Sequence, residues 1–200
     1  MFKIPPKDTF LKKLYDHQRH LYSEAIKHCV KFRNAIDVGG HVGFFSSKMV
    51  KDFTHVYAFE PMFHEYLTEN VKASNITIYP VGLSDREANF KFYVREWNTG
   101  SSRIDKDGKD IIKCDVLDNY KFTDIDLIKI DAENHEKFIL RGMSTFFENN
   151  SPVIIIEIND KFTPQINQNR NKILESNISK DCKKTYNIIK NELGIEGDIH

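Results

Sequence analysis

The sequence contains few cysteines, and they follow no ligand pattern. Its 200 residues include only three, Cys29, Cys114 and Cys182, which lie far apart and form no C-x-x-C. This argues against a disulfide framework and against a zinc site of the usual His/Cys spacing. We interpret them as reduced thiols, as is typical of a cytoplasmic protein.

Long hydrophobic runs are also missing. The longest, residues 153–156, is the length of a strand, whereas a membrane span needs roughly 18 or more apolar residues. Residues 1–10 are polar and contain proline, unlike a signal peptide. We therefore expect no membrane span and a cytoplasmic location.

Neither sign of charge is in excess. Lys plus Arg and Asp plus Glu each number 29, whereas a nucleic-acid interface normally requires a basic surplus. We therefore do not expect a nucleic-acid partner. The oligomeric state cannot be inferred from this composition.

Strand-like and helix-like segments alternate through the middle of the chain, which favours a parallel α/β sheet. The expected strands are residues 35–38, 56–59, 76–81, 127–131 and 153–158. The expected helices are residues 42–52, 64–73 and 134–148. Period-two alternation at 88–94 predicts an added antiparallel strand, and 111–116 is expected to be another short strand.

The length indicates one domain. We divide it into an N-terminal helical extension (1–34), a core (35–159) and a polar C-terminal segment (160–200). Apolar residues at helical spacing predict amphipathic helices over residues 8–32, with Asp8 as an N-cap.

The most informative segment is an apolar run that ends at Asp37 and enters a turn containing Gly39, Gly40 and Gly43. A second apolar run ends at Glu60, 23 residues after Asp37. Glycines permit positive φ and close approach of a ligand to the backbone. This layout indicates a nucleotide-type site at the carboxyl edge of a doubly wound sheet.

Charge indicates which nucleotide would bind there. The segment lacks the third glycine of G-x-G-x-x-G and the Gly-Lys-Ser/Thr of a P-loop, and the carboxylate of Asp37 disfavours phosphates. S-adenosylmethionine (SAM) has no phosphate, carries two cationic groups, and offers a ribose diol to Glu60. We predict SAM. An NAD-dependent oxidoreductase is the rival enzyme, and a helix cap is the purely structural interpretation of Asp37.

Polar side chains interrupt two apolar strands near their ends. Lys129, Asp131 and Glu133 share one face of the first, and Glu157 lies on the next. Buried charges need partners or a solvated cleft. We expect them to line a cleft beside the glycine-rich turn, with a structural Lys129–Glu157 pair as the alternative for Lys129.

Four blocks in this order resemble the FkbM family of SAM-dependent methyltransferases. They are D-V-G-G-H-V-G-F-F-S at 37–46, A-F-E-P at 58–61, V-G-L-S-D at 81–85 and I-K-I-D-A-E-N-H-E at 128–136. The resemblance implies a three-layer Rossmann-like α/β fold with a mostly parallel sheet and helices on both faces. It also implies O-methylation of a hydroxyl, often on a sugar or a secondary metabolite.

The resemblance implies a set of cofactor-binding residues: Asp37, Gly39, Gly40, His41, Gly43, Glu60, Pro61, Ser84, Asp85 and Asp131. In that set, Asp37, Gly39 and Gly43 shape the methionine end, Glu60 holds the ribose, and Ser84 and Asp85 lie near the adenine. His41, within the turn, is expected to touch the carboxylate of the donor.

Four residues are candidates for catalysis: Lys129, Asp131, Glu133 and His135. A positioned base would help a hydroxyl to lose its proton. His135 is a candidate because a free imidazole titrates near neutrality, and the alternative is an exposed histidine at a helix start. We expect no obligatory metal, although Asp131, Glu133 and Glu157 offer oxygen ligands suited to Mg²⁺ or Ca²⁺.

Residues 97–102 and the C-terminal segment bear on the acceptor. Residues 97–102 carry a tryptophan and hydroxyls that suit a sugar-like acceptor. Asn134 stands where the family usually has glycine, and residues 160–200 show no clear trace of two final strands, which implies a short or remodelled C-terminal end. The alternative function is a catalytically inactive SAM-binding or protein-interaction module.

Overall fold

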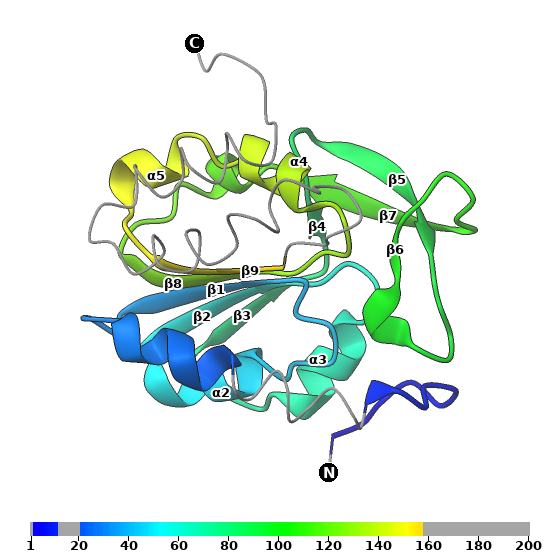
Figure 1. Cartoon of the computed structure of the whole chain (residues 1–200), viewed down its shortest axis with the longest axis horizontal. Helices are drawn as coiled ribbons and strands as arrows, with labels where there is room; N and C mark the ends of the chain where they lie inside the picture. The colour runs from blue at the N-terminus through cyan, green and yellow to red at the C-terminus, as the bar shows by residue number, and fades with distance from the viewer. Residues whose placement is uncertain (1, 12–20, 158–200) are drawn as a thin grey trace, which may run out of the picture.

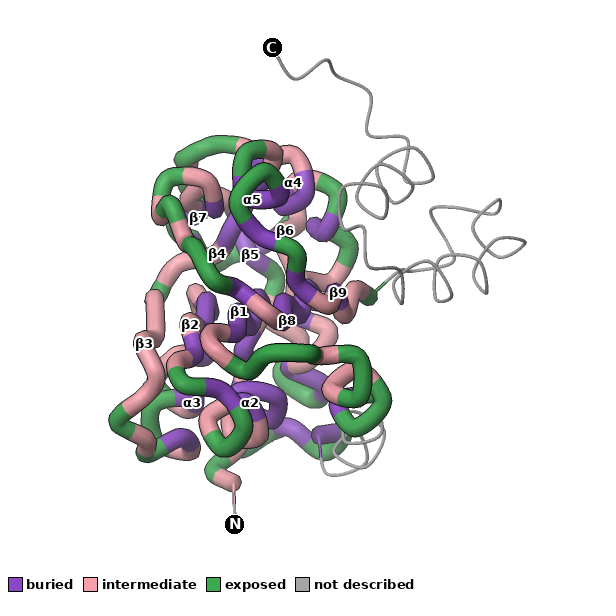
Figure 2. Tube along the Cα trace, turned by 90° about the vertical axis from the view of Figure 1, so that its left-hand side faces the viewer, coloured by how far each residue is buried: buried purple, intermediate pink, exposed green. Residues whose placement is uncertain are grey.

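The computed structural model describes residues 2–11 and 21–157 and centres on a five-stranded parallel sheet. Its order is β3-β2-β1-β8-β9. The strands are β1 (Asn34–Val38), β2 (His55–Phe59), β3 (Ile76–Tyr79), β8 (Ile125–Ile130) and β9 (Val153–Ile156). Central strands are buried and β3 at the edge is only half-buried (Figure 2), which explains why β1 and β8 are almost continuously apolar.

Helices cover both faces of this sheet (Figure 1). On one face lie α2 (Ser46–Asp52) and α3 (His64–Asn70), and on the other lie α4 (Glu136–Arg141) and α5 (Phe146–Asn149). A core cluster that includes Ile36, Ile128 and Leu140 fills the α4 and α5 side. The expected α/β fold, with a mostly parallel sheet between two helical layers, is confirmed.

A second, four-stranded sheet stands beside the carboxyl ends of the parallel strands (Figure 1). Its order is β4-β7-β5-β6, and β5 pairs antiparallel with both neighbours. The strands are β4 (Gly82–Leu83), β5 (Ala88–Tyr93), β6 (Arg103–Ile104) and β7 (Asp110–Asp115). The 3₁₀ turn η2 (Thr99–Ser101) lies between β5 and β6, and η3 (Leu117–Tyr120) follows β7. The two added strands expected from the sequence are therefore present.

The helix expected over residues 134–148 is wrong, because it is two short helices. Helix α4 ends at Arg141 with Gly142 as its C-cap, and Gly142 packs so tightly that a Cβ there would lie 2.1 Å from the backbone oxygen of Ser84. Asp118 then accepts the amides of Thr145 and Phe146, at 3.0 and 2.8 Å, and starts α5.

Two other boundaries differ from the expectation. Helix α2 begins at Ser46 rather than at residue 42, because the glycine-rich turn continues to Phe45 with positive φ at His41 and Gly43. The strand expected at 76–81 ends at Tyr79, and the chain then crosses to the second sheet as β4.

The chain ends are described only in part. Residues 21–25 are helical and lead into η1 (Ile26–His28), whereas residues 2–10 and 29–33 are not helical. The expectations for residues 12–20, for Ile158 and for the polar C-terminal segment lie outside the described residues. In the described ranges, no helix combines the length and the apolar character that a bilayer crossing requires.

Candidate functional site

The glycine-rich turn between β1 and α2 lies against the ends of β2 and β8. Gly39 has a φ of 74°, and a Cβ there would lie 1.9 Å from the backbone oxygen of Asp131. The amides of Gly39 and Gly40 both donate to the Phe59 carbonyl, at 2.9 and 3.1 Å. The turn therefore depends on an absent side chain at Gly39, and it is anchored to the neighbouring strand.

Glu60 fixes the other side of this turn. One carboxylate oxygen, Oε2, accepts the amide of His41 at 2.9 Å, and Oε1 accepts the amides of Met62 and Phe63 at 2.9 Å. The residue is buried. A carboxylate has about four lone-pair sites, so after three bonds it retains capacity for one further donor, such as a ribose hydroxyl.

Lys129 lies beneath the turn as a buried ammonium group. It donates to the carbonyls of Val38 and Gly39, at 3.2 and 2.7 Å, and lies 3.4 Å from Asp37 Oδ1 and 3.5 Å from Asp131 Oδ2. Burial alone would lower the pKa of Lys129, but the charges of Asp131 and Asp37 outweigh burial and raise it. The expected Lys129–Glu157 pair is wrong.

Asp37 is fully buried between Lys129 and α2. Its Oδ2 accepts the Ser46 hydroxyl at 2.6 Å, while the N-cap of α2 is Phe45, with no side-chain capping bond. The interpretation of Asp37 as a helix cap is therefore wrong. Asp37 instead neutralises the ammonium group that supports the turn.

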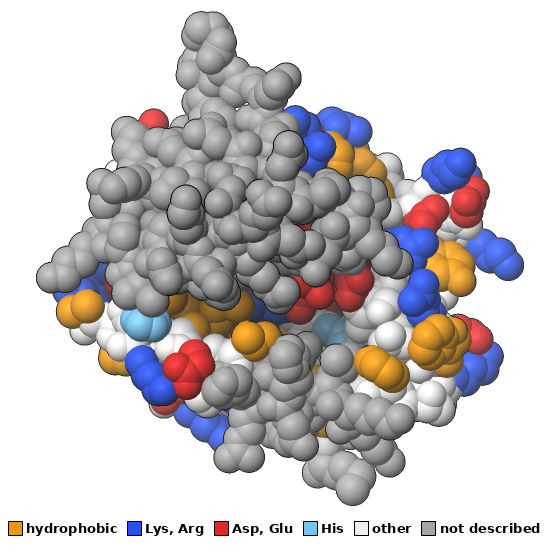
Figure 3. Space-filling view, in the orientation of Figure 1, with side chains coloured by type: hydrophobic (Ala, Val, Ile, Leu, Met, Phe, Trp, Pro, Cys, Tyr) orange, Lys and Arg blue, Asp and Glu red, His pale blue; other side chains and the backbone are white. Residues whose placement is uncertain are grey.

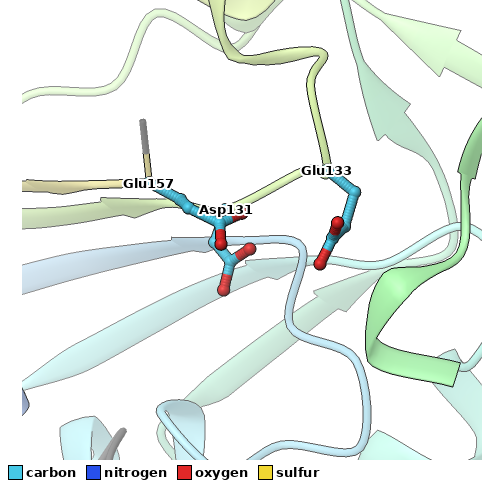
Figure 4. Close-up of side chains that lie close together, drawn as sticks. All are labelled: Asp131, Glu133 and Glu157. Carbon is cyan, nitrogen blue, oxygen red and sulfur yellow. The ribbon is translucent and has the colours of Figure 1, made fainter. Parts of the chain in front are cut away.

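Three carboxyl groups converge where β8 and β9 end (Figure 4). Asp131, Glu133 and Glu157 each place a carboxylate oxygen within 4.8 Å of the others. Burial and the neighbouring charges of Asp131 and Glu136 raise the pKa of Glu133 to about 7. Carboxylate oxygens are the ligands that Mg²⁺ or Ca²⁺ prefers. The proximity of the three carboxyl groups also favours their protonation, because like charges repel.

Glu157 differs from Glu133 in exposure. The residue as a whole is exposed, but its carboxyl end is sheltered in the cluster. Partial desolvation, together with the charges of Asp131 and Glu133, raises the pKa of Glu157 to about 8.

His135 is buried, so the alternative of an exposed helix-start histidine is wrong. Its Nε2 lies 2.9 Å from Ser84 Oγ, and its ring stacks on Phe138 with the centroids 4.7 Å apart. Burial lowers the pKa of His135 to about 4. The ring is therefore neutral at physiological pH, and its hydrogen-bonding partner is Ser84, from the sequence block at residues 81–85.

These groups surround one pocket of about 850 Å³, including its open mouth. Figure 3 shows the hollow with acidic side chains at its centre. The sequence-predicted residues that line it are Gly39, Gly40, His41, Glu60, Pro61, Lys129, Asp131, Glu133 and His135. Asp37, Gly43, Ser84, Asp85 and Glu157 do not line it, so the expectation that Glu157 lines the cleft is wrong. Asp37 and Ser84 lie behind the lining, and Asp85 pairs with Arg86.

The sequence analysis missed the apolar wall opposite the turn. Phe92, Ile104 and Ile112 reach the pocket from the second sheet, and Phe63 reaches it from the start of α3. The alternation within residues 88–94 already marks Phe90 and Phe92 as one face. Only the pairing of β5, β6 and β7 shows that this face is turned toward the glycine-rich turn.

Comparisons with known proteins place these features in context. Residues 37–187 match the family model for the methyltransferase FkbM domain. Among solved structures, methyltransferase FkbM from Methylobacillus flagellatus KT matches at 20% identity and a TM-score of 0.45, over 64% of this chain and 34% of that one. The chain thus spans about a third of that protein.

Two other solved structures match over less of the chain. A putative type II methyltransferase from Anaeromyxobacter dehalogenans has 19% identity and a TM-score of 0.28, over 32% of this chain and 27% of that one. Phosphoethanolamine N-methyltransferase 1 from Haemonchus contortus, solved with phosphoethanolamine and S-adenosylhomocysteine, has 18% identity and a TM-score of 0.27, over 37% and 18%. No curated protein matches the chain.

Proposed function

The chain belongs to the FkbM methyltransferase domain family, and from this premise we propose that it transfers a methyl group from SAM to a hydroxyl of a saccharide or another small molecule. The observation that carries the proposal is the pocket lined by the glycine-rich turn and by the carboxyl groups of Asp131 and Glu133. The backbone of the turn can hold a methyl donor on one side of the pocket, and the carboxylates on the other side can accept a proton.

The charges around the pocket suit a donor without phosphates. The one lysine among the lining residues, Lys129, is already bound by Asp37 and Asp131, whereas Glu60, Asp131 and Glu133 present carboxylates. SAM supplies an activated methyl group on a cationic sulfur. We propose that Glu60 accepts a ribose hydroxyl, that Gly39, Gly40 and Pro61 shape the donor cradle, and that His135, supported by Ser84 and Asp85, lies at the adenine end.

Glu133 is the proposed general base. A base works best when its pKa lies near the working pH, and the pKa of Glu133 is about 7. His135 is bound to Ser84, and its pKa of about 4 makes it a weaker base. Lys129 is a charged ammonium and cannot accept a proton. Asp131 is proposed to hold Lys129 and to keep the pKa of Glu133 high.

The acceptor is proposed to enter along residues 97–102. Trp97 is 56% exposed, the Arg95 guanidinium lies 5.4 Å from its ring, and Thr99, Gly100 and Ser102 line the pocket. An exposed ring beside polar groups gives a sugar both an apolar face to stack on and hydrogen-bonding partners. This arrangement supports a saccharide acceptor.

The test is methyl transfer from radiolabelled SAM to a panel of saccharides and hydroxylated small molecules, compared for wild type and Glu133→Gln. We expect turnover to fall by about 10²–10⁴-fold, because a positioned base contributes that much, while S-adenosylhomocysteine affinity stays within about threefold. Glu148→Gln, on an exposed part of α5, is the matched control and should behave as wild type.

The result also separates an enzyme from a binding module. Donor binding without transfer to any member of the panel would favour the inactive SAM-binding or interaction module. Equal turnover by wild type and Glu133→Gln would show that Glu133 is not the base.

A further inference from the structure

An N-terminal strap, which we define as residues 2–11, crosses the outside of the glycine-rich turn. In Figure 1 it lies beside α3. The Lys3 amide donates to Asn70 Oδ1 at 2.7 Å, and Asn70 Nδ2 donates to the carbonyls of Lys3 and Val42, each at 2.8 Å. Leu11 is buried against Val42 and Phe44. The strap is therefore joined both to α3 and to the turn that the donor is proposed to occupy.

Asp8 is the buried polar residue of this strap. Its Oδ1 accepts the amides of Phe10 and Leu11, at 2.8 and 2.9 Å, as expected of an N-cap. Its Oδ2 accepts both the amide and the hydroxyl of Thr99, at 2.6 and 2.5 Å. Burial alone would raise the pKa of Asp8, but these hydrogen bonds outweigh burial and lower it. Asp8 is thus a carboxylate that can only accept.

The single hydroxyl proton of Thr99 determines the direction of the hydrogen bond between Thr99 and His41. Because that proton goes to Asp8, the Thr99 oxygen can only accept from its other neighbour, His41 Nε2, at 2.9 Å. His41 Nε2 must therefore carry a hydrogen. Burial lowers the pKa of His41 despite the charges of Glu60, Asp131 and Asp8, which oppose the shift, so the ring is neutral. A neutral ring protonated at Nε2 leaves Nδ1 as an acceptor.

His41 is also part of the pocket wall. It lines the pocket, its ring packs edge-on against Phe63 with centroids 5.0 Å apart, and its backbone has a φ of 49° within the turn. Among the described residues, the His41 ring makes one hydrogen bond, to the Thr99 hydroxyl. Nδ1 is thus available to a ligand.

From this geometry we infer that Asp8 is a positioning residue, which acts through Thr99 to hold His41 as the Nε2–H tautomer, so that Nδ1 accepts a hydrogen bond from the ammonium group of the donor. This inference rests on the proposed function only for the identity of the donor. It also revises the contact expected from the sequence, because a lone pair on Nδ1 repels a carboxylate and attracts an N–H group.

The tautomer can be measured without any ligand. Long-range ¹H–¹⁵N NMR distinguishes a protonated ring nitrogen from an unprotonated one, and the His41 signals are assigned as those missing from His41→Asn. Wild type should show hydrogen on Nε2. Thr99→Ser, which keeps the hydroxyl, should show the same, whereas Thr99→Val should show a mixture. Hydrogen on Nδ1 in wild type would overturn the inference even if neither Thr99 variant folded.

The ligand contact is tested with three probes and calorimetry. They are S-adenosylhomocysteine, its analogue without the amino group and its analogue without the carboxyl group. Thr99→Val should weaken the two amino-containing probes by tenfold or more, because a hydrogen bond to a charged group is lost. The probe without the amino group should change less than threefold. Thr99→Ser should bind all three as wild type does.

The alternatives give different patterns. Equal weakening of all three probes by Thr99→Val would mean that the contacts of Thr99 only stabilise the turn. A loss of affinity confined to the two probes with a carboxyl group would mean that His41 contacts the carboxylate of the donor instead. Either result overturns the inference. If wild type binds none of the three, the proposed donor is wrong, and the NMR experiment still decides which tautomer His41 adopts and whether Thr99 holds it.

Discussion

The two sides of the pocket are stabilised in different ways. The donor side consists of the glycine-rich turn and the ends of β1, β2 and β8, and its polar groups, such as Lys129 and Glu60, are buried and satisfied by other groups of the protein. The acceptor side consists of the second sheet and residues 97–102, where Trp97 remains 56% exposed. A change on the donor side should therefore alter folding as well as binding, whereas a change at the exposed rim of the acceptor side should alter binding alone.

The largest effect expected is that of Lys129→Met on the donor side. Removing the ammonium group leaves the fully buried Asp37 without its counter-charge, and an unpaired buried charge costs about 3–5 kcal/mol of unfolding free energy. Urea unfolding measures this loss. The double variant Lys129→Met/Asp37→Asn removes both charges and should recover much of the stability. A double variant no more stable than Lys129→Met would contradict the role assigned to the pair.

Gly39→Ala tests the backbone of the same side. The added Cβ would lie 1.9 Å from the Asp131 carbonyl oxygen at a φ of 74°, so the end of β8 must move. We expect a loss of about 3 kcal/mol in urea unfolding. Gly40→Ala is the matched control, because its Cβ would meet only the flexible end of Leu67, and it should cost about 1 kcal/mol. Equal losses would mean that the close approach at Gly39 is not special.

Trp97→Ala applies the comparison to the acceptor side. With the acceptor found in the panel, KM for that acceptor should rise about tenfold, which corresponds to about 1.4 kcal/mol, while Tm and S-adenosylhomocysteine affinity stay unchanged. Tyr93→Ala is the control, since Tyr93 is also exposed beside an arginine but alternates with the pocket-facing Phe92. A rise in KM for both variants would show that exposure alone, not position, governs acceptor binding.

The smallest effect expected is a shift in pH dependence. Glu133 must be deprotonated to act as a base, so kcat/KM should rise with pH through about 7. Arg95 lowers the pKa of Glu133, and Arg95→Gln should therefore move this limb to higher pH by about half a unit. Lys91→Gln, exposed on the outer face of β5, should leave the limb in place. A shift to lower pH in Arg95→Gln would contradict the assignment of Glu133 as the base.

Much of the donor side was predictable because its signals are local. The strands around Asp37 and Glu60, and the turn between β1 and α2, follow from short apolar runs and glycines. The partner of Lys129 was not predictable in this way. Lys129 lies on β8, between β1 and β9, and register decides the outcome, because Lys129 is opposite Asp37 in β1 but opposite Ile155 in β9.

The remaining errors come from contacts that are distant in the sequence. Gly142, where α4 ends, packs against the backbone of Ser84, and His135 lies within hydrogen-bond distance of the Ser84 hydroxyl. Thr99 links Asp8 to His41. No periodicity within one segment carries this information. The acceptor wall has the same character, since it is formed when β5 pairs with β6 and β7.

The most direct test of the account is calorimetric titration of the wild-type protein with SAM and with S-adenosylhomocysteine, with NAD titrated in parallel and a thermal melt recorded for each. The account predicts binding of the first two ligands and not of NAD. At a hundredfold excess over Kd, either should stabilise the fold by about 2.7 kcal/mol. Binding of NAD, or no binding by a folded sample, would contradict the claim that this pocket holds SAM.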